Sequence, residues 1–458
     1  MTGLPADRMH TFDPEMTSLI LEYVRDRLEM NAPVDGLGDR ADIQVALDGL
    51  ITDQGRPAAE VLSVYIDSLA DTILSADSPR YFAFIPAAPT KAALLFDMVV
   101  SAASLQACSW LEAAGAVAAE NQALRVLMDA AGLPQTAGGV FVSGGSAGNL
   151  SALVVARDRA RAQRLANGLA DTRLAVLVSD QAHSSIASAL NILGMDAVVV
   201  ATDARDGRLD RAALERAMAC LDVSNVVAVV ATAGTTNAGI VDDMQAIADC
   251  AHDRQWWMHV DAAYGGAGLL AASVAWRYDG IERADSIVTD PHKWWFAPYD
   301  CAALMYRQPH LARAIHAQDA SYLDVIHEVD TDFNPSDLAY HLTRRARGLA
   351  LWFSLAVNGL DAYRDAVEHS VHLAQYAAQR IEEHPDLELV REPELSVVLF
   401  RRRGWELADY ARWSRALLES QTAFVAHSSW RGEPVARLVF LHPSTTQEVV
   451  DQMLQTLR

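Results

Sequence analysis

The stretch Trp257-Met-His-Val-Asp-Ala-Ala-Tyr264 contains a short apolar strand that ends at an acidic residue. Continuous apolar runs of this kind are typical of strands covered by helices on both faces. Asp261 closes the strand, and the small side chains of Ala262 and Ala263 leave room for a flat ring close to the sheet. A carboxylate here could bind a protonated ring nitrogen, or it could cap a turn or helix.

Six further β-branched or apolar runs alternate with helical segments, which predicts βα units and a mostly parallel sheet. They are Val140-Phe-Val142, Leu174-Ala-Val-Leu-Val178, Ala197-Val-Val-Val200, Val226-Val-Ala-Val-Val230, Ser286-Ile-Val288 and Ala302-Ala-Leu-Met-Tyr306. The predicted fold class is α/β, with a seven-stranded sheet.

Segments on either side of these units have other patterns. Apolar residues recur at helical spacing between about residues 14 and 78, and a helix followed by strands begins near residue 361. We expect a helical N-terminal segment (1–85), a large α/β domain (86–360) and a small α+β domain (361–458).

Composition excludes several classes of function. The 458 residues carry a formal net charge of −22, which disfavours binding to nucleic acid or anionic lipid. No apolar run reaches the roughly 20 residues of a membrane span, and Met1 to Met16 lacks a signal core, so we expect a cytoplasmic protein. The four scattered cysteines are expected to be reduced core residues, and no metal site is predicted.

Polar residues follow the predicted strands, where open parallel sheets bind their ligands. These strand ends are Ser143-Gly-Gly-Ser-Ala-Gly-Asn149, Ser179-Asp-Gln-Ala-His-Ser-Ser185, Thr232-Ala-Gly-Thr-Thr236 and Asp290-Pro-His-Lys293. The first leads into a helical stretch (149–163), whose free N–H groups could bind a phosphate. An ordinary strand-to-helix turn explains the glycines equally well, and an NTP-binding P-loop is not supported.

Lys293 lies after the next predicted strand along the chain from Asp261, and Trp294 and Trp295 follow it directly. We expect these aromatic neighbours to desolvate the lysine and so to lower its pKa. An amine and a carboxylate at neighbouring strand ends are what a Schiff-base cofactor with a ring nitrogen requires. His183 could stack on such a ring, although a lone histidine is more often a structural hydrogen-bonding residue.

Seven ordered motifs make the chain resemble the group II pyridoxal 5′-phosphate (PLP)-dependent amino-acid decarboxylases, the family of aromatic-amino-acid, histidine and glutamate decarboxylases. They are Tyr81-Phe-Ala-Phe-Ile-Pro86, Gly144-Gly-Ser-Ala-Gly-Asn149, Ser179-Asp-Gln-Ala-His-Ser-Ser185, Ala233-Gly-Thr-Thr236, His259-Val-Asp-Ala-Ala-Tyr264, Asp290-Pro-His-Lys-Trp294 and Arg344-Arg-Ala-Arg347. The resemblance implies PLP fold type I and an intertwined homodimer. The N-terminal helices would embrace the partner, and the active site would lie at the subunit interface.

The resemblance also implies roles for individual residues. Lys293 would form the Schiff base, Asp261 would bind the pyridinium nitrogen, and His183 and Ala263 would cover the two ring faces. Ser146, Ala147 and His292 would hold the phosphate, and Gly148 would also bind the cofactor. Thr235 would lie near the cofactor hydroxyl or the substrate carboxylate. The substrate pocket would draw on Phe82, Phe84, Ile85, Trp110 and Tyr340, which favours an aromatic or apolar amino acid.

The expected reaction is decarboxylation of an L-amino acid to its amine, through an external aldimine and a quinonoid. The sequence departs from the family's pattern at Ala87, where aromatic-acid members carry threonine. A second departure is the absence of a loop tyrosine near Asn334 or Pro335, where the nearest tyrosines are Tyr322 and Tyr340. The alternatives are an oxygen-using aldehyde synthase, another fold type I enzyme, or a catalytically silent binding protein.

Overall fold

A computed structural model describes residues 9–86, 88–170, 172–203, 206–327 and 333–457. Its large sheet has the strand order β1-β7-β6-β5-β4-β2-β3. The strands are β1 (Gly138–Val142), β2 (Ala175–Ser179), β3 (Asp196–Val200), β4 (Val226–Thr232), β5 (Trp257–Asp261), β6 (Ser286–Thr289) and β7 (Ala302–Tyr306). β7 runs antiparallel to both β1 and β6, and the pairs among β2 to β6 are parallel. The prediction of seven strands in a mostly parallel α/β sheet is confirmed.

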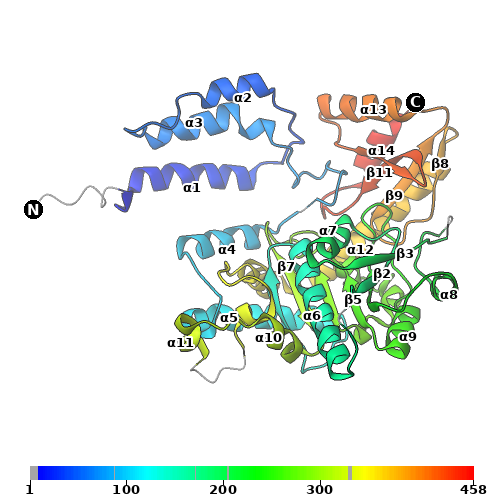
Figure 1. Ribbon diagram of the computed structural model, residues 1–458. Helices are drawn as coiled ribbons and strands as arrows, with labels where there is room; N and C mark the ends of the chain where they lie inside the picture. The colour runs from blue at the N-terminus through cyan, green and yellow to red at the C-terminus, as the bar shows by residue number, and fades with distance from the viewer. Residues whose placement is uncertain (1–8, 87, 171, 204–205, 328–332, 458) are drawn as a thin grey trace, which may run out of the picture.

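Helices cover both faces of this sheet (Figure 1). One face is covered by α5 (Trp110–Ala130), α8 (Arg211–Cys220), α9 (Met244–Arg254) and α12 (Gly348–Glu382), and the other by α6 (Gly145–Ala166), α7 (Ser184–Leu193) and α10 (Pro309–His316). Outside these two layers, α4 (Lys91–Ala102) packs against α12, and α11 (Asp324–His327) is a single short turn of helix. Short 3₁₀ turns are η2 (Ala70–Thr72), η3 (Gly265–Leu270), η4 (Ala275–Tyr278), η5 (Ile281–Arg283), η6 (Ser321–Leu323) and η7 (Pro335–Leu338).

The two faces of the sheet belong to two separate apolar cores, because successive strand residues point to opposite sides. Val140 and Val142 pack with α6, α7 and α10, whereas Phe141 between them packs with α5, α8, α9 and α12. α6 lies very close to β6: a Cβ atom on Gly148 would be 2.4 Å from Cγ2 of Val288. This glycine therefore allows the helix to approach the sheet.

The C-terminal part forms a second, antiparallel sheet with the order β10-β11-β9-β8. Its elements are β8 (Leu387–Leu389), β9 (Val397–Arg402), α13 (Leu407–Glu419), β10 (Ala426–Trp430), β11 (Glu433–Val439) and α14 (Gln447–Gln455). The expected small C-terminal domain is present. α12 reaches this domain after a break in its helical backbone at Gly359, which has a φ of 75°. This point is one residue before the expected boundary at residue 360, and the domain limits themselves stay predictions.

Three N-terminal helices, α1 (Pro14–Glu29), α2 (Arg40–Leu47) and α3 (Ala58–Ser68), extend away from the large sheet (Figure 1). None of the three contains a buried residue. Within the described residues, no helix is long and apolar enough to cross a membrane. The four cysteines are free, but Cys220 is exposed at the end of α8, so its predicted place in the core was wrong.

Candidate active site

A cavity of about 230 Å³ lies at the carboxyl ends of the parallel strands. It brings together six predicted site residues from four places in the chain, which are Ser146, His183, Asp261, Ala263, His292 and Lys293. Each follows a strand or begins a helix, so the strand ends meet at one edge of the sheet as the topology requires.

Lys293 is the amine of this cavity. Its Nζ lies 2.9 Å from Oδ2 of Asp290, whose side chain is only 2% exposed. Burial alone would lower the pKa of Lys293, but the negative charges of Asp290 and Asp261 outweigh it and raise the pKa. The predicted lowering was therefore wrong. Trp294 and Trp295, expected to desolvate the lysine, are fully buried in the main core.

Asp290 begins one of the quoted motifs, but the sequence analysis gave this residue no role in the site. Its Oδ1 is buried and has no hydrogen-bond partner in the described part of the chain. Both carboxylate oxygens lie close to the start of α6, because a Cβ on Gly145 would be 3.1 and 3.2 Å from them. The position three residues before Lys293 at a strand end was the available signal.

Asp261 is 5% exposed and is held by hydrogen bonds at both oxygens. Oδ2 accepts from Nδ2 of Asn149 at 3.0 Å, and Oδ1 accepts from the backbone N–H of Ala263 at 3.1 Å. Two donors stabilise the charged form of a carboxylate. Its geometry suits an anionic partner for a ring nitrogen.

The first turn of α6 forms an anion cradle on the same cavity. Gly144 is the N-cap and has no side chain to occupy the helix N–H groups, and Gly145 and Ser146 line the cavity after it. A Cβ on Gly145 would also come within 3.0 Å of Cβ of Ala263. A side chain at residue 145 would therefore fill the space between the helix start and the end of β5.

His292 and His183 complete the cavity. Nδ1 of His292 accepts from the backbone N–H of Cys301 at 3.0 Å, and burial lowers the pKa of this histidine. His183 caps α7, and its Nδ1 lies 2.8 Å from Oγ of Ser185. The donor set therefore fits a phosphate-bearing aromatic aldehyde: an amine, an anion cradle, a carboxylate and a flat imidazole in one cavity.

Comparisons with known proteins agree with this geometry. Residues 44–403 match the pyridoxal-dependent decarboxylase conserved domain. The chain belongs to this decarboxylase family. It is 29% identical over 467 residues to an aromatic-L-amino-acid decarboxylase of Bacillus atrophaeus, covering 99% of this chain and 96% of that protein. It is 32% identical over 439 residues to an L-2,4-diaminobutyrate decarboxylase of Rhizobium meliloti (strain 1021), covering 93% and 84%.

Among solved structures, Oryza sativa TDC with PLP and tryptamine matches with a TM-score of 0.89 and 27% identity, covering 98% of this chain and 99% of that chain. The chain is therefore a PLP-dependent amino-acid decarboxylase, a carboxy-lyase with PLP fold type I. The expected family, cofactor, fold and reaction class are confirmed.

Three of the residues expected to contact PLP do not line the cavity of this decarboxylase. Gly148 packs on Val288, and Ala147 lines an adjoining cavity. Thr235 is 1% exposed, and its Oγ1 accepts from the backbone N–H of Ile240. Its neighbours Thr232 and Thr236 line the cavity instead.

The adjoining cavity, of about 760 Å³, shares Gly144, Ser146, His183 and Ser185 with the first. Tyr340 and His183 both line it. Ala87 and the segment 328–332, just before the positions where the loop tyrosine is absent, lie outside the described residues.

The other expected substrate residues are not at the Lys293 cavity within one chain. Phe82 packs edge-on against Phe440 in the C-terminal core, with ring centroids 5.4 Å apart. Phe84 is 61% exposed, Ile85 packs on the main core, and Trp110 begins α5.

Arg437 of β11 is a second residue that the sequence analysis missed. This 5%-exposed guanidinium donates to the backbone oxygens of Phe84 at 2.7 Å, Thr236 at 2.5 Å and Asn237 at 3.2 Å. Burial lowers the pKa of Arg437 to about 10. Its bonds to three carbonyls fasten the segment 81–86 and the loop after β4 to the small domain.

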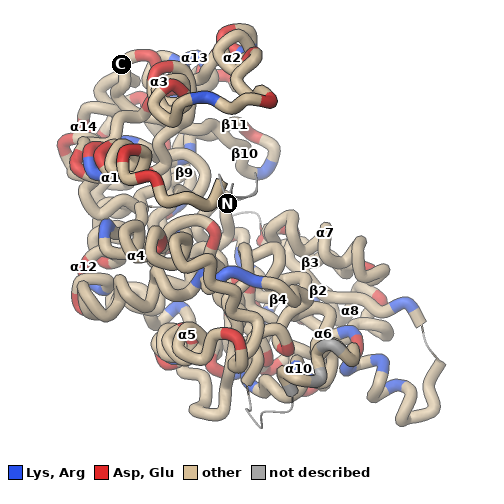
Figure 2. Tube along the Cα trace, turned by 90° about the vertical axis from the view of Figure 1, so that its left-hand side faces the viewer, with Lys and Arg blue, Asp and Glu red and all other residues tan. Residues whose placement is uncertain are grey.

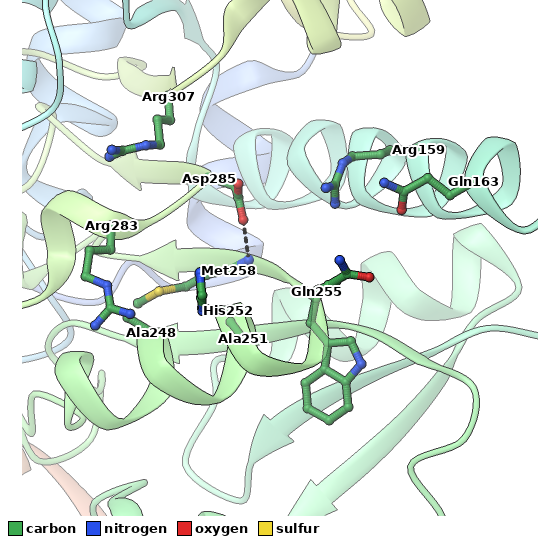
Figure 3. A pocket seen from close by; sticks show the side chains of 11 residues that line it. Arg159, Gln163, Ala248, Ala251, His252, Gln255, Met258, Arg283, Asp285 and Arg307 are labelled. Atoms are coloured by element: carbon green, nitrogen blue, oxygen red, sulfur yellow. Dashed lines mark hydrogen bonds between the residues drawn. The ribbon is translucent and has the colours of Figure 1, made fainter.

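A separate pocket of about 420 Å³ lies at the opposite edge of the sheet, near the starts of β5 and β6 (Figure 3). Its charged side chains already have partners: Arg283 pairs with Asp249 at 2.7 Å, and Asp285 accepts from the backbone N–H of Met258 at 2.8 Å. None of the predicted site residues lines it, and we assign it no part in the reaction.

Proposed function

We propose that this decarboxylase converts an aromatic L-amino acid to its amine and carbon dioxide, with PLP bound to Lys293. The observation that carries the assignment is the meeting of the Lys293 amine, the Asp261 carboxylate and the uncapped start of α6 in one cavity. The choice of an aromatic substrate is supported by the relative that spans 99% of the chain.

When bound, PLP supplies an aldehyde for amines and a ring that accepts the electrons left by the departing carboxylate. The chain's own residues would hold it in place. The N–H groups of Gly145 and Ser146, with His292, would bind the phosphate, and Asp261 would keep the ring nitrogen protonated. Ala263 and His183 would cover the ring faces. The substrate bond that breaks would be chosen by orientation, since only a bond perpendicular to the ring overlaps its π system.

Borohydride reduction tests the lysine assignment. The chain has two lysines, and Lys91 is an exposed residue at the start of α4. Peptide mapping should find the reduced cofactor on Lys293. Label on Lys91 would contradict the assignment.

The substrate class is tested by screening amino acids for released carbon dioxide and identifying each product. We expect aromatic amino acids to give their amines. Diaminobutyrate is the main competitor, but Asp300, an acidic residue of the adjoining cavity, is paired with Arg347 at 2.9 Å and is not free for a second ammonium group. Turnover of diaminobutyrate alone would overturn the aromatic assignment and leave the decarboxylase assignment intact.

The aldehyde synthase is the second candidate, favoured by the absence of tyrosine at Asn334 and Pro335. It would consume oxygen and release aldehyde, ammonia and hydrogen peroxide. We propose the amine, because Tyr340 and His183 line the same cavity and either is a source of a proton.

We further propose a cytoplasmic homodimer with the active site near the subunit interface. Apolar side chains on α1 to α3 are unusually exposed, including Ile20 at 41%, Val45 at 77% and Ile66 at 40%. Exposed apolar faces of this extent are typical of interaction surfaces. A second copy is the proposed occupant, because α1 to α3 contain no buried residue that would fix them in a single chain.

A further inference from the structure

Asn149 lies at the centre of a buried hydrogen-bond chain behind the active site. It is 1% exposed on the second turn of α6. Its Nδ2 donates to Oδ2 of Asp261 and to Oγ of Ser185, both at 3.0 Å, and its Oδ1 lies 2.8 Å from Nε2 of His259. One amide therefore joins three polar side chains.

The direction of each hydrogen bond follows from the carboxylate. Because the charged Asp261 only accepts, the amide nitrogen of Asn149 must face it, and Oδ1 must then accept from His259. His259 carries its proton on Nε2, and its Nδ1 accepts from Oγ of Ser286 at 2.8 Å. That oxygen in turn accepts from Nε1 of Trp257 at 2.8 Å. Each donor in this series of hydrogen bonds has one acceptor, so only one set of proton positions satisfies all of them.

A branch of the same chain reaches His183. Oγ of Ser185 accepts from Asn149, so its own hydrogen is free to point at Nδ1 of His183, 2.8 Å away. The backbone N–H of Ser185 points at the same nitrogen at 3.2 Å. A neutral His183 therefore has its proton on Nε2, the nitrogen left for a ligand in the cavity.

We infer that Asn149 is a positioning residue, and that His259 locks its amide so that both N–H groups face Asp261 and Ser185. The lock stabilises the charged carboxylate that the ring nitrogen of PLP requires, and this consequence rests on the function proposed above. An acceptor cannot replace the amide nitrogen, because two acceptors would then face each other in a buried site. Alanine would leave Oδ2 of Asp261 and Nε2–H of His259 without their partner.

The test compares Asn149→Ala with Asn149→Asp at neutral pH, measuring PLP affinity of the apoenzyme and the ¹⁵N-histidine NMR signals. Loss of a hydrogen bond to a charged group weakens binding by roughly 10-fold or more, so we expect that loss for alanine. Aspartate keeps the shape but adds a second carboxylate, and we expect a loss of roughly 100-fold or more. His259 should show the Nε2–H tautomer in the unmutated protein and a changed signal in both variants.

A space-filling role would give the opposite order. If Asn149→Asp bound PLP as well as the unmutated enzyme, or if both variants lost affinity equally with His259 unchanged, the inference would be overturned. Ser151→Ala is the control, because Ser151 is also a buried hydrogen-bonding residue of α6 but takes no part in the hydrogen bonds around Asn149. It should leave both readouts unchanged.

A second variant keeps the test decisive if Asn149→Asp does not fold. Ser286→Ala removes the hydroxyl that donates to Nδ1 of His259 and accepts from Nε1 of Trp257, and it leaves Asn149 in place. His259 should then become a mixture of tautomers, and PLP should bind a few-fold more weakly. Unchanged tautomers in Ser286→Ala would contradict the inference. Because the NMR readout uses the apoenzyme, it succeeds or fails independently of whether aromatic amino acids are the substrate.

Discussion

Asp261 is the residue on which the proposed chemistry most depends, because both of its oxygens are already held by N–H donors at the end of β5. Asp261→Asn keeps the shape but removes the charge that would hold a proton on the ring nitrogen. We expect kcat to fall by roughly 100-fold or more, since a buried charge partner shifts a pKa by one to three units. The variant should still bind PLP, which absorbance measures independently of turnover.

Asp285→Asn is the matched control for this substitution. Asp285 also accepts a backbone N–H bond in the same sheet, but at the opposite edge (Figure 3). It should leave kcat nearly unchanged. Near-normal turnover in Asp261→Asn would refute the proposed role of Asp261 in keeping the ring nitrogen protonated.

Tyr340 is the proposed proton donor that replaces a loop tyrosine. It is 48% exposed, its ring stacks on His341 at 4.0 Å, and it lines the cavity that contains His183. Tyr340→Phe should raise the ratio of hydrogen peroxide to amine, because delivery of a proton by a positioned group is worth roughly 100- to 10,000-fold. Coupled peroxide and amine assays measure the ratio.

Tyr376→Phe, in the C-terminal domain, is the control, because Tyr376 bonds to Asp451 away from the cavity. An unchanged ratio in Tyr340→Phe would exclude that tyrosine. Stoichiometric oxygen consumption by the unmutated enzyme would favour the aldehyde synthase instead.

His259 makes stability depend on pH. Burial lowers the pKa of His259 to about 4 despite the nearby charge of Asp261, whereas its ordinary value is 6.5. Between pH 4 and pH 6.5 the unfolded chain binds more protons than the folded chain. The contribution of His259 to the free energy of unfolding is therefore complete above about pH 6.5 and is lost as the pH falls to about 4. The loss is at most about 3 kcal/mol.

His259→Gln should therefore be less stable at neutral pH but should lose less stability on acidification. Denaturant unfolding at several pH values measures both effects. His252→Gln is the control, since His252 is an exposed residue of α9. A slope equal to that of the unmutated protein would contradict the neutral, buried state of His259.

At the scale of elements, the sequence predicts strands better than contacts. The seven runs of the large sheet are apolar because helices cover both faces, and that pattern is visible without a structure. β10 was not predicted, because Ala426-His-Ser-Ser-Trp430 has mostly polar residues. Its turn, Arg431-Gly432, has a positive φ at both residues, and the glycine was the one local signal.

In the candidate site, too, the positions at strand ends could be predicted and the contacts between side chains could not. Lys293, Asp261 and His183 follow strands, so topology alone predicts that they meet. The raised pKa of Lys293 could not be predicted, because it depends on the distance from Nζ to Asp290. The bonds of Arg437 to the loop 200 and 201 residues earlier in the chain could not be predicted either.

The close packing of α6 on β6 gives a prediction about stability. A Cβ on Gly148 would overlap Cγ2 of Val288 at 2.4 Å, so Gly148→Ala must shift the helix that carries the anion cradle. Overpacking of this kind costs about 1–3 kcal/mol. Gly115→Ala in α5 is the matched control, since a Cβ there meets nothing within 4 Å, and alanine in a helix stabilises by up to about 1 kcal/mol.

Thermal unfolding of the two alanine variants measures this difference, and PLP affinity should fall in Gly148→Ala alone. Equal stability of the two variants would show that α6 can move away from the sheet without cost. The cradle would then not depend on how closely α6 packs against the sheet.

At the scale of the whole molecule, the net charge of −22 opposes self-association, so dimerisation has to come from apolar contacts. Figure 2 shows acidic positions along α1 and across the C-terminal domain, with basic positions between them. Screening by salt weakens repulsion among exposed charges. We therefore expect the dimer to tighten, or to stay unchanged, as salt concentration rises.

The helices α1 to α3 should be the surface that forms the dimer. The double variant Ile20→Glu/Val45→Glu places charges on exposed apolar residues of α1 and α2, and burying unpaired charges strongly opposes association. Sedimentation velocity should find a dimer for the unmutated chain and a monomer for this variant. Leu165→Glu is the matched control, because Leu165 is 78% exposed at the end of α6, close to the 77% of Val45, and should leave the dimer intact. A variant that stayed dimeric would move the interface away from α1 and α2, and a monomeric variant with full activity would show that each chain holds a complete active site.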